Sequence, residues 1–143
     1  MRDQDNNIFR LVTSPITVVE VEKLLHGTTD GAHVLFSGVV RSESSGKKVI
    51  QLEFEAYEPM ALREWNAIAE RLRARWTVHR IVMHHRLGIV PAGEIAVVAA
   101  VSSPHRKEAF EACQYLMDEL KRTVPIWKKE VFDDGSAWVS PTP

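Results

Sequence analysis

The segment EIAVVAAV, residues 94–101, places the strongest constraint on how this chain can fold. It is a nearly continuous run of small and β-branched apolar residues, without the alternation of a strand that has one water-facing side. Such runs are typical of strands that are covered on both faces. The run therefore predicts a sheet in which this segment is a central strand.

Amphipathic helices are predicted on both sides of that strand in the sequence. One starts near Pro59, which a first helical turn tolerates. Its apolar stripe at helical spacing is Ala61, Leu62, Trp65, Ile68, Ala69, Leu72 and Trp76. The next has Ser103 as its cap and Pro104 in its first position. Its expected buried stripe is Ala109, Phe110, Cys113, Leu116, Met117 and Leu120. A shorter helix follows the capping residue Thr17 and ends at Gly27.

The remaining apolar or alternating segments predict strands. They are residues 8–12, 31–41, 49–57, 79–88, 94–101, 126–132 and a short stretch around Trp138, with a polar loop at 42–48 and turns at 91–94 and 133–135. The order β-α-β-β-α-β-β-α-β-β predicts an α+β fold, in which about three helices and a mixed, largely antiparallel sheet form a two-layer sandwich. Because no repeat or linker interrupts the chain, we expect residues 1–143 to form a single domain.

The charge balance excludes a general nucleic-acid binder. The 18 basic and 19 acidic side chains give a formal net charge of -1, whereas nucleic-acid-binding domains carry a basic excess. An anion site must therefore be a local cluster of cations. The start MRDQDNNIFR lacks the apolar core of a signal peptide, and no apolar run approaches the roughly 20 residues that span a bilayer. We expect a cytoplasmic protein.

Metal and cofactor chemistry find little support in the sequence. None of the six histidines forms a helical His-x-x-x-His pair, and His84 and His85 are adjacent on a predicted strand, so they point to opposite faces. The two glycine-rich patterns that bind phosphate groups, G-x-G-x-x-G and G-x-x-x-x-G-K-S/T, do not occur in the sequence. The lone Cys113 lies in a helical stripe and is better explained as a buried apolar residue than as a nucleophile. We expect no metal and no cofactor, and we interpret Glu53 and Glu55 as the solvated face of a strand.

The segment SPHRKEAF, residues 103–110, suggests an anion site. Unpaired N–H groups make a helix N-terminus attractive to anions and unfavourable for cations, yet His105, Arg106 and Lys107 lie there. A bound phosphate would offset these charges. A solvated helix start, balanced by Glu108, is the structural alternative.

More cations lie at the other end of the same predicted helix. Lys121 is in its last turn, where the helix dipole already favours a cation. Lys128 and Lys129 follow in an extended stretch and face opposite ways, so only one of them can point back toward Lys121. Arg41, at the end of an apolar strand, can add a bidentate anion ligand.

Distance limits how these groups combine. His105 and Lys121 are 16 residues apart, which is about 24 Å along a helix, so one small ligand cannot touch both. Either the chain has two sites, or a second copy brings its His105 and Arg106 to the lysines of the first. The second alternative predicts a symmetric dimer with composite pockets.

A set of short segments recurs in one known family in the same order and spacing. They are FSGVVR (36–41), FEAYEPMA (54–61), HRLG (85–88), SSPHRKEAFEAC (102–113), DELK (118–121), PIWKKE (125–130) and GSAWV (135–139). From about residue 8 to 139, the chain therefore resembles the MoaE family, the large, catalytic subunits of molybdopterin synthase. The resemblance implies an α/β hammerhead-type fold and a homodimer within a heterotetramer.

The resemblance also implies an activity and a partner. The family transfers sulfur from the C-terminal Gly-Gly thiocarboxylate of a small, ubiquitin-like sulfur-carrier subunit to cyclic pyranopterin monophosphate, which becomes the dithiolene of molybdopterin. The family's catalytic lysines fall on Lys121 and Lys128. The implied substrate-binding residues are Val39, Val40, Arg41, His105, Arg106, Lys121, Lys128, Lys129 and Glu130. Two other functions stay open: a dimeric scaffold that binds a ubiquitin-like tail or a phosphorylated ligand without chemistry, and a phosphate-ester enzyme that acts alone.

Overall fold

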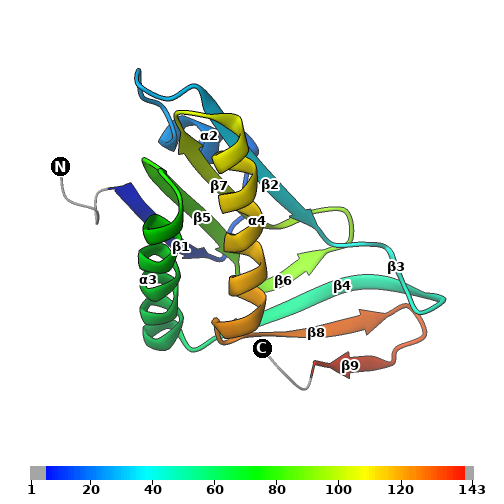
Figure 1. Ribbon diagram of the computed structural model, residues 1–143. Coiled ribbons are helices and arrows are strands. Elements are labelled where there is room, and N and C mark those ends of the chain that lie inside the picture. Colours follow the sequence, from blue (N-terminus) through cyan, green and yellow to red (C-terminus); the bar gives the residue numbers. More distant parts are fainter. Residues whose placement is uncertain (1–5, 141–143) are drawn as a thin grey trace.

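The computed structural model describes residues 6–140, which form two sheets (Figure 1). Helices cover the first sheet, and the second sheet lies at one end of it. The first sheet has the strand order β1-β5-β7-β2. Its strands are β1 (Asn7–Val12), β5 (Arg80–Arg86), β7 (Ile95–Ser103) and β2 (Ala32–Val39). β1 runs parallel to β5, and the other neighbours are antiparallel. The sheet is therefore mixed and largely antiparallel, as predicted.

The second sheet extends away from the helices (Figure 1). Its order is β3-β4-β8-β9, and β6 also pairs with β4. The strands are β3 (Glu43–Ser44), β4 (Lys47–Ala56), β6 (Gly88–Pro91), β8 (Ile126–Phe132) and β9 (Ala137–Val139). All of these pairings are antiparallel. The predicted pattern did not separate the strands into two sheets, and it missed β3 and β6, because both are too short to show alternation.

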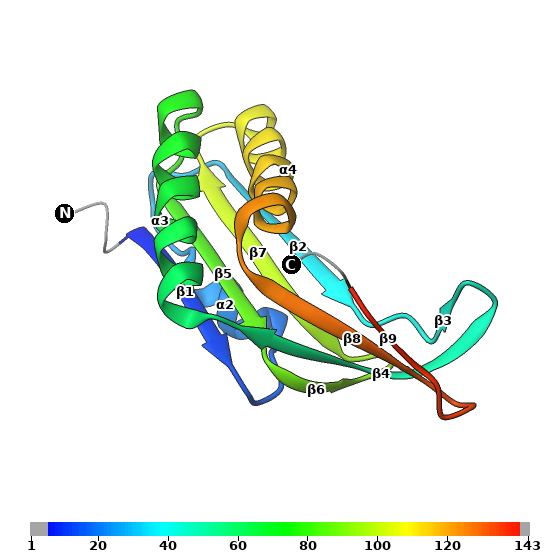
Figure 2. The same cartoon turned by 90° about the horizontal axis from the view of Figure 1, so that it is seen from below.

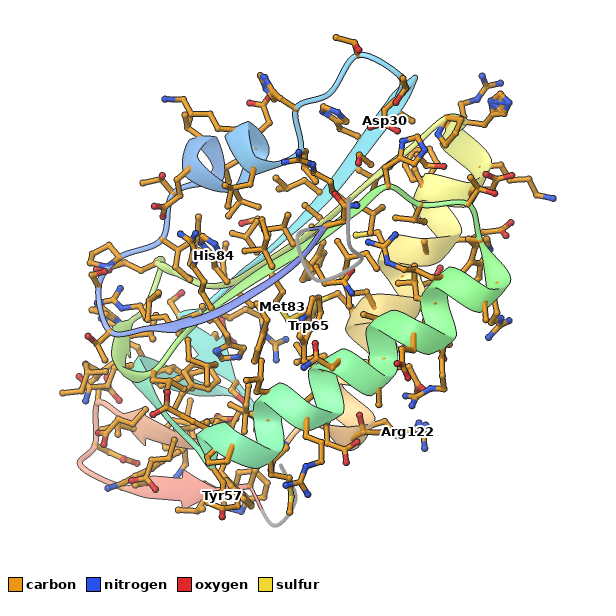
Figure 3. All side chains as sticks on the ribbon, turned by 90° about the vertical axis from the view of Figure 1, so that its left-hand side faces the viewer. Asp30, Tyr57, Trp65, Met83, His84 and Arg122 are labelled. Carbon is orange, nitrogen blue, oxygen red and sulfur yellow. The ribbon has the colours of Figure 1, made fainter. Side chains whose placement is uncertain are left out.

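Two long helices, α3 (Glu58–Arg75) and α4 (Arg106–Thr123), lie side by side on one face of the first sheet (Figure 2). The short helix α2 (Val18–Leu24) covers the other face. Neighbouring residues of β5 divide between these two sides: Met83 packs in the core under α3 with Trp65, whereas His84 points toward α2 (Figure 3). The opposite orientations of His84 and His85 that the sequence predicted follow from this alternation.

The central strand predicted at residues 94–101 corresponds to β7. Residues 96–103 of β7 are all buried, between β5 on one side and β2 on the other. The described helices and the strand arrangement confirm the α+β prediction. Thr17 caps α2 through a capping box with Glu20, but that helix ends at Leu24, before Gly27.

Several local predictions were wrong. Ser103 does not cap α4: it continues β7 opposite Ala32, and its hydroxyl donates to the Thr77 carbonyl at 2.7 Å. Strand pairing thus extends to residue 103, and the helix begins at Arg106 with His105 in the capping position. Leu62 and Phe110, which were expected in the buried stripes, are 49% and 62% exposed because they lie on the outer faces of α3 and α4.

Among residues 6–140, no helix is long and apolar enough to cross a membrane. The expectations that concern the first five and the last three residues lie outside the described part of the chain.

Candidate active site

A cavity of about 510 Å³ lies between the two sheets, beside the last turn of α4. Strands β2, β4, β5, β7 and β8 and the end of α4 all contribute to its wall. The lining residues that carry polar or charged side chains are Ser37, Arg41, Glu43, Ser44, His85, Lys121, Lys128, Glu130 and Ser140. Its apolar wall includes Phe36, Leu52, Phe54 and Met117. The cavity can therefore hold a ligand that has both an anionic and an aromatic part.

Three of the predicted cations meet in this cavity: Arg41, Lys121 and Lys128. Lys121 comes from the last turn of α4, and Lys128 comes from β8, which starts soon afterwards. The connection consists of Val124 and Pro125, both buried, and the Ile126 N–H donates to the Val124 carbonyl at 2.9 Å. This short, fixed return directs the strand back along the helix end.

Alternation along β8 decides which neighbours of Lys128 share its face. Lys128 pairs with Phe54 of β4, and both side chains line the cavity. Lys129 pairs with Glu53 and is exposed on the outer face, whereas Glu130 lines the cavity again. The structure thus brings Lys128 and Glu130 to the cavity and turns Lys129 away from it.

The other predicted residues of the cavity come from the end of β2. A bulge between Gly38 and Val39 shifts the register against β7 before Arg41. A Cβ at Gly38 would lie 2.8 Å from Val97 Cγ1, so a larger residue would force the Val97 side chain to shift. Val39 and Val40 also line the cavity, and Val40 is buried in the core of the second sheet.

His105 and Arg106 lie elsewhere, at the opposite end of α4. Together with Gly31, Pro104 and Lys107 they line a separate shallow hollow. Gly31, the residue before β2, packs closely against Pro104, since a Cβ at Gly31 would lie 2.5 Å from the Pro104 carbonyl oxygen. One copy of the chain therefore does not bring His105 and Arg106 to the lysines, which agrees with the estimated length of the helix.

Cys113 is buried under the first sheet, as predicted. Its Sγ lies 3.6 Å from the Ala99 carbonyl oxygen, and burial raises the pKa of the thiol to about 11. A thiol with this pKa stays protonated at neutral pH and is a poor nucleophile. In the described part of the chain, no three His, Cys, Asp or Glu side chains come together in a way that could hold a metal ion.

Two ionisable residues of the cavity were missed as site candidates. Glu43 comes from the segment that was predicted to be a polar loop. His85 belongs to the HRLG segment, and burial lowers the pKa of its imidazole to about 4. The alternation of β5 gave a signal for His85, because it separates His85 from His84, but the sequence did not show which face borders a cavity.

The chain is similar to known proteins over most of its length. The model of the family described as MoaE protein matches residues 11–123. The molybdopterin synthase catalytic subunit of Nostoc sp. is 47% identical over 134 residues, which cover 92% of this chain and 81% of that protein. The crystal structure of molybdopterin synthase from Staphylococcus aureus matches with a TM-score of 0.85 at 37% identity, over 91% of this chain and 94% of that one.

A further solved structure is the protein–protein complex of subunits 1 and 2 of molybdopterin-converting factor from Helicobacter pylori. It matches with a TM-score of 0.74 over 93% of this chain and 90% of that one. The identity is 20%, so this likeness concerns the fold alone.

Proposed function

The chain belongs to the MoaE protein family, and on that premise we propose that it is the catalytic subunit of a molybdopterin synthase. It is a sulfurtransferase of molybdenum cofactor biosynthesis. It moves sulfur from the C-terminal thiocarboxylate of a small ubiquitin-like subunit to cyclic pyranopterin monophosphate, which forms the dithiolene of molybdopterin. The observation that carries the proposal is the convergence of Arg41, Lys121 and Lys128 on one cavity.

Electrostatics explains why this reaction needs such a cavity. The thiocarboxylate and the cyclic phosphate are both anions, and they repel each other when they are brought together away from water. Fixed cations at the meeting point remove that repulsion and stabilise the charge that develops in the transition state. Lys121 binds and polarises the thiocarboxylate, Arg41 holds the phosphate, and Lys128 stabilises charge or transfers a proton as the phosphate ring opens.

His105 and Arg106 complete the site from a second copy of the chain. Their hollow is distinct from the cavity within one copy, and its cations lie at the N-terminus of α4, which attracts an anion. A symmetric dimer would place this corner of one copy at the cavity of the other, which makes two composite sites. With one small sulfur-carrier subunit on each copy, the assembly is a heterotetramer.

The sulfur enters from the partner, so the catalytic subunit needs no nucleophile of its own. The burial of Cys113 and the raised pKa of its thiol agree with a sulfur that comes from the partner. The molybdopterin-converting factor of Helicobacter pylori, which was solved as a complex of subunits 1 and 2, shares the fold of this chain. A cytoplasmic location is part of the proposal and stays a prediction.

Reconstitution tests the proposal. The purified chain is mixed with cyclic pyranopterin monophosphate and the small subunit in its thiocarboxylate form, and dithiolene formation is followed. We expect product only when all three components are present. Binding without product would favour a scaffold that does no chemistry. Conversion of the phosphate ester without the small subunit would favour an enzyme that acts alone, and either result would overturn the proposal.

A further inference from the structure

His85 is the one imidazole in the wall of the cavity that the structure describes. It lies on β5, and its side chain is almost fully buried, with 5% of the residue exposed. Its ring meets that of Phe54 edge to face, with 5.0 Å between the centroids and an interplanar angle of 76°. Phe54 is the residue opposite Lys128 on the neighbouring strand. The imidazole is therefore held in a fixed plane close to the catalytic lysine.

The ring's hydrogen bond fixes where its proton lies. Nδ1 is 2.9 Å from the carbonyl oxygen of Arg86. A carbonyl oxygen only accepts, so Nδ1 carries the hydrogen and donates it. Burial keeps the imidazole neutral at pH 7, since it lowers the pKa to about 4. Nε2 is then left with a free lone pair.

Nε2 is also accessible from the cavity. It has no hydrogen-bond partner among the described residues. It also does not belong to the unpartnered polar atoms that are fully closed off from solvent. His84 gives the contrast on the other face of β5, because its Nε2 is sealed in the protein without a partner. An acceptor that is held in place, neutral and open to a cavity is suited to recognise a ligand donor.

The cations of the cavity cannot supply this function. Arginine and lysine only donate hydrogen bonds, so Arg41, Lys121 and Lys128 recognise the anionic groups of the reactants. Glu43 and Glu130 accept hydrogen bonds but carry charge, and they attract the lysines as well as a ligand. A neutral acceptor on the cavity wall can accept from an uncharged N–H group without adding a charge to the site, and it repels a carbonyl oxygen in the same place.

We propose that His85 Nε2 accepts a hydrogen bond from an uncharged N–H group of the bound reactants and so sets their orientation against Lys128. This inference rests on the proposed function. Two reactants offer such a group: the pterin ring of the substrate has ring N–H groups, and the Gly-Gly tail of the small subunit has backbone amides. The chemistry of recognition is the same for both, and separate binding measurements tell them apart.

The test uses His85→Phe and His85→Gln in the full-length protein. Phenylalanine keeps an aromatic ring of similar size but has no lone pair, whereas the glutamine side-chain oxygen can reach the place of Nε2. Calorimetry measures the affinity for cyclic pyranopterin monophosphate in one arm and for the small subunit with an ordinary carboxylate end in the other. Loss of the acceptor leaves a buried donor unpaired, so we expect affinity to fall about tenfold to a hundredfold in one arm for His85→Phe. His85→Gln should recover most of it.

Unchanged affinity of His85→Phe in both arms overturns the inference. So does an equal loss in both variants, because that result reports packing and not an acceptor. Should His85→Phe fail to fold, nitrogen-15 spectra of the wild-type histidine rings decide the question. We expect a proton on Nδ1 and none on Nε2, and a shift of the Nε2 resonance when one reactant is added. An Nε2 resonance that neither reactant moves contradicts the proposal.

The outcome is separable from that of the proposed function. A wild-type protein that makes no dithiolene with both reactants present disproves the enzyme activity. An active wild-type protein whose His85→Phe variant binds both reactants normally disproves only the role of His85.

Discussion

Lys128 stands directly opposite Phe54 in the antiparallel pairing of β8 with β4, and both side chains line the same cavity. Phe54 in turn contacts the ring of His85 from the first sheet. The strand pairing thus links a catalytic candidate of one sheet to a fixed imidazole of the other. Lys129, the next residue along β8, points to the outer face.

This relationship predicts a sharp difference between two adjacent lysines. Lys128→Ala should lower the rate of dithiolene formation about a hundredfold or more, because a cation is lost where charge develops. Lys129→Ala is the matched control and should keep the wild-type rate, since an exposed charge contributes little. Single-turnover measurements with both variants check the prediction. Equal losses of rate in the two variants would show that the side of β8 on which a lysine lies does not determine its role in the reaction.

Lys121→Ala should abolish product formation and leave the dimer intact. Lys121 is exposed in the last turn of α4, so its removal leaves no cavity in the core, and folding does not depend on it. Product analysis and size-exclusion chromatography measure the two effects. Near-normal turnover of this variant would rule out its role in binding the thiocarboxylate.

Mixed dimers test whether Arg106 acts across the dimer. Lys121→Ala and Arg106→Ala chains with different tags are co-expressed, and the mixed dimer is isolated by tandem purification. One of its two composite sites then carries both native residues, so about half the wild-type activity should return. Each parent homodimer is the control and should be nearly inactive. A mixed dimer as inactive as its parents would show that Arg106 does not complete the site of the other copy.

Cys113 should be dispensable for catalysis. Cys113→Ala should keep the rate of dithiolene formation and lose about 1–2 kcal/mol of unfolding free energy, because a buried atom is removed. In the native wild-type protein, a thiol reagent at pH 8 should label Cys113 very slowly, since its pKa is raised to about 11. Labelling should become fast only after denaturation. Loss of activity in a folded Cys113→Ala protein would contradict the proposed source of sulfur.

The ion pairs of Glu119 on α4, one with Arg122 of the same helix and one with Arg71 of α3, predict a pH dependence of stability. Arg122 Nε donates to Glu119 Oε2 at 2.6 Å, and Arg71 Nη2 donates to Oε1 at 3.0 Å. Arg122 first, and then Arg71, lower the pKa of Glu119 from 4.5 to about 2. A carboxylate with a lowered folded-state pKa stabilises the fold above its unfolded pKa, and this contribution is lost as the pH falls from about 4.5 toward about 2.

Glu119→Gln should therefore cost about 1–2 kcal/mol at pH 7, since solvent weakens pairs with partly exposed arginines. The difference from wild type should shrink as the pH falls toward 2. Urea unfolding at several pH values measures it, and Glu55→Gln on an exposed strand face is the control. A difference that does not change with pH would mean that packing, and not the ion pairs, explains the loss.

Much of this fold follows from local patterns in the sequence. The uninterrupted apolar run of β7 predicts a covered central strand, and alternation along β8 predicts that Lys128 and Lys129 face opposite ways. The start of α4 could not be predicted in the same way. Ser103 followed by Pro104 is a good helix cap by local preference, but pairing with Ala32 of a distant strand keeps Ser103 in the sheet.

The candidate site shows the same limit. Helix length was enough to separate His105 from Lys121 and to suggest a dimer. The role of His85 depends on which face of β5 borders a cavity, and this is set by how the two sheets meet. Leu62 and Phe110 fit a helical stripe, yet they lie just outside the contact with the first sheet.

The buried pair Val124 and Pro125 has a consequence for how proteins of this design can vary. This pair is the whole connection between the helix of Lys121 and the strand of Lys128. The seven-residue interval between the lysines therefore determines how the two side chains are placed relative to each other. An extra residue there would either shift β8 by one step, which turns Lys129 inward, or displace one lysine from the other. Insertions and deletions are therefore expected in the exposed turns at 45–46 and 133–135, and the interval itself should keep its length.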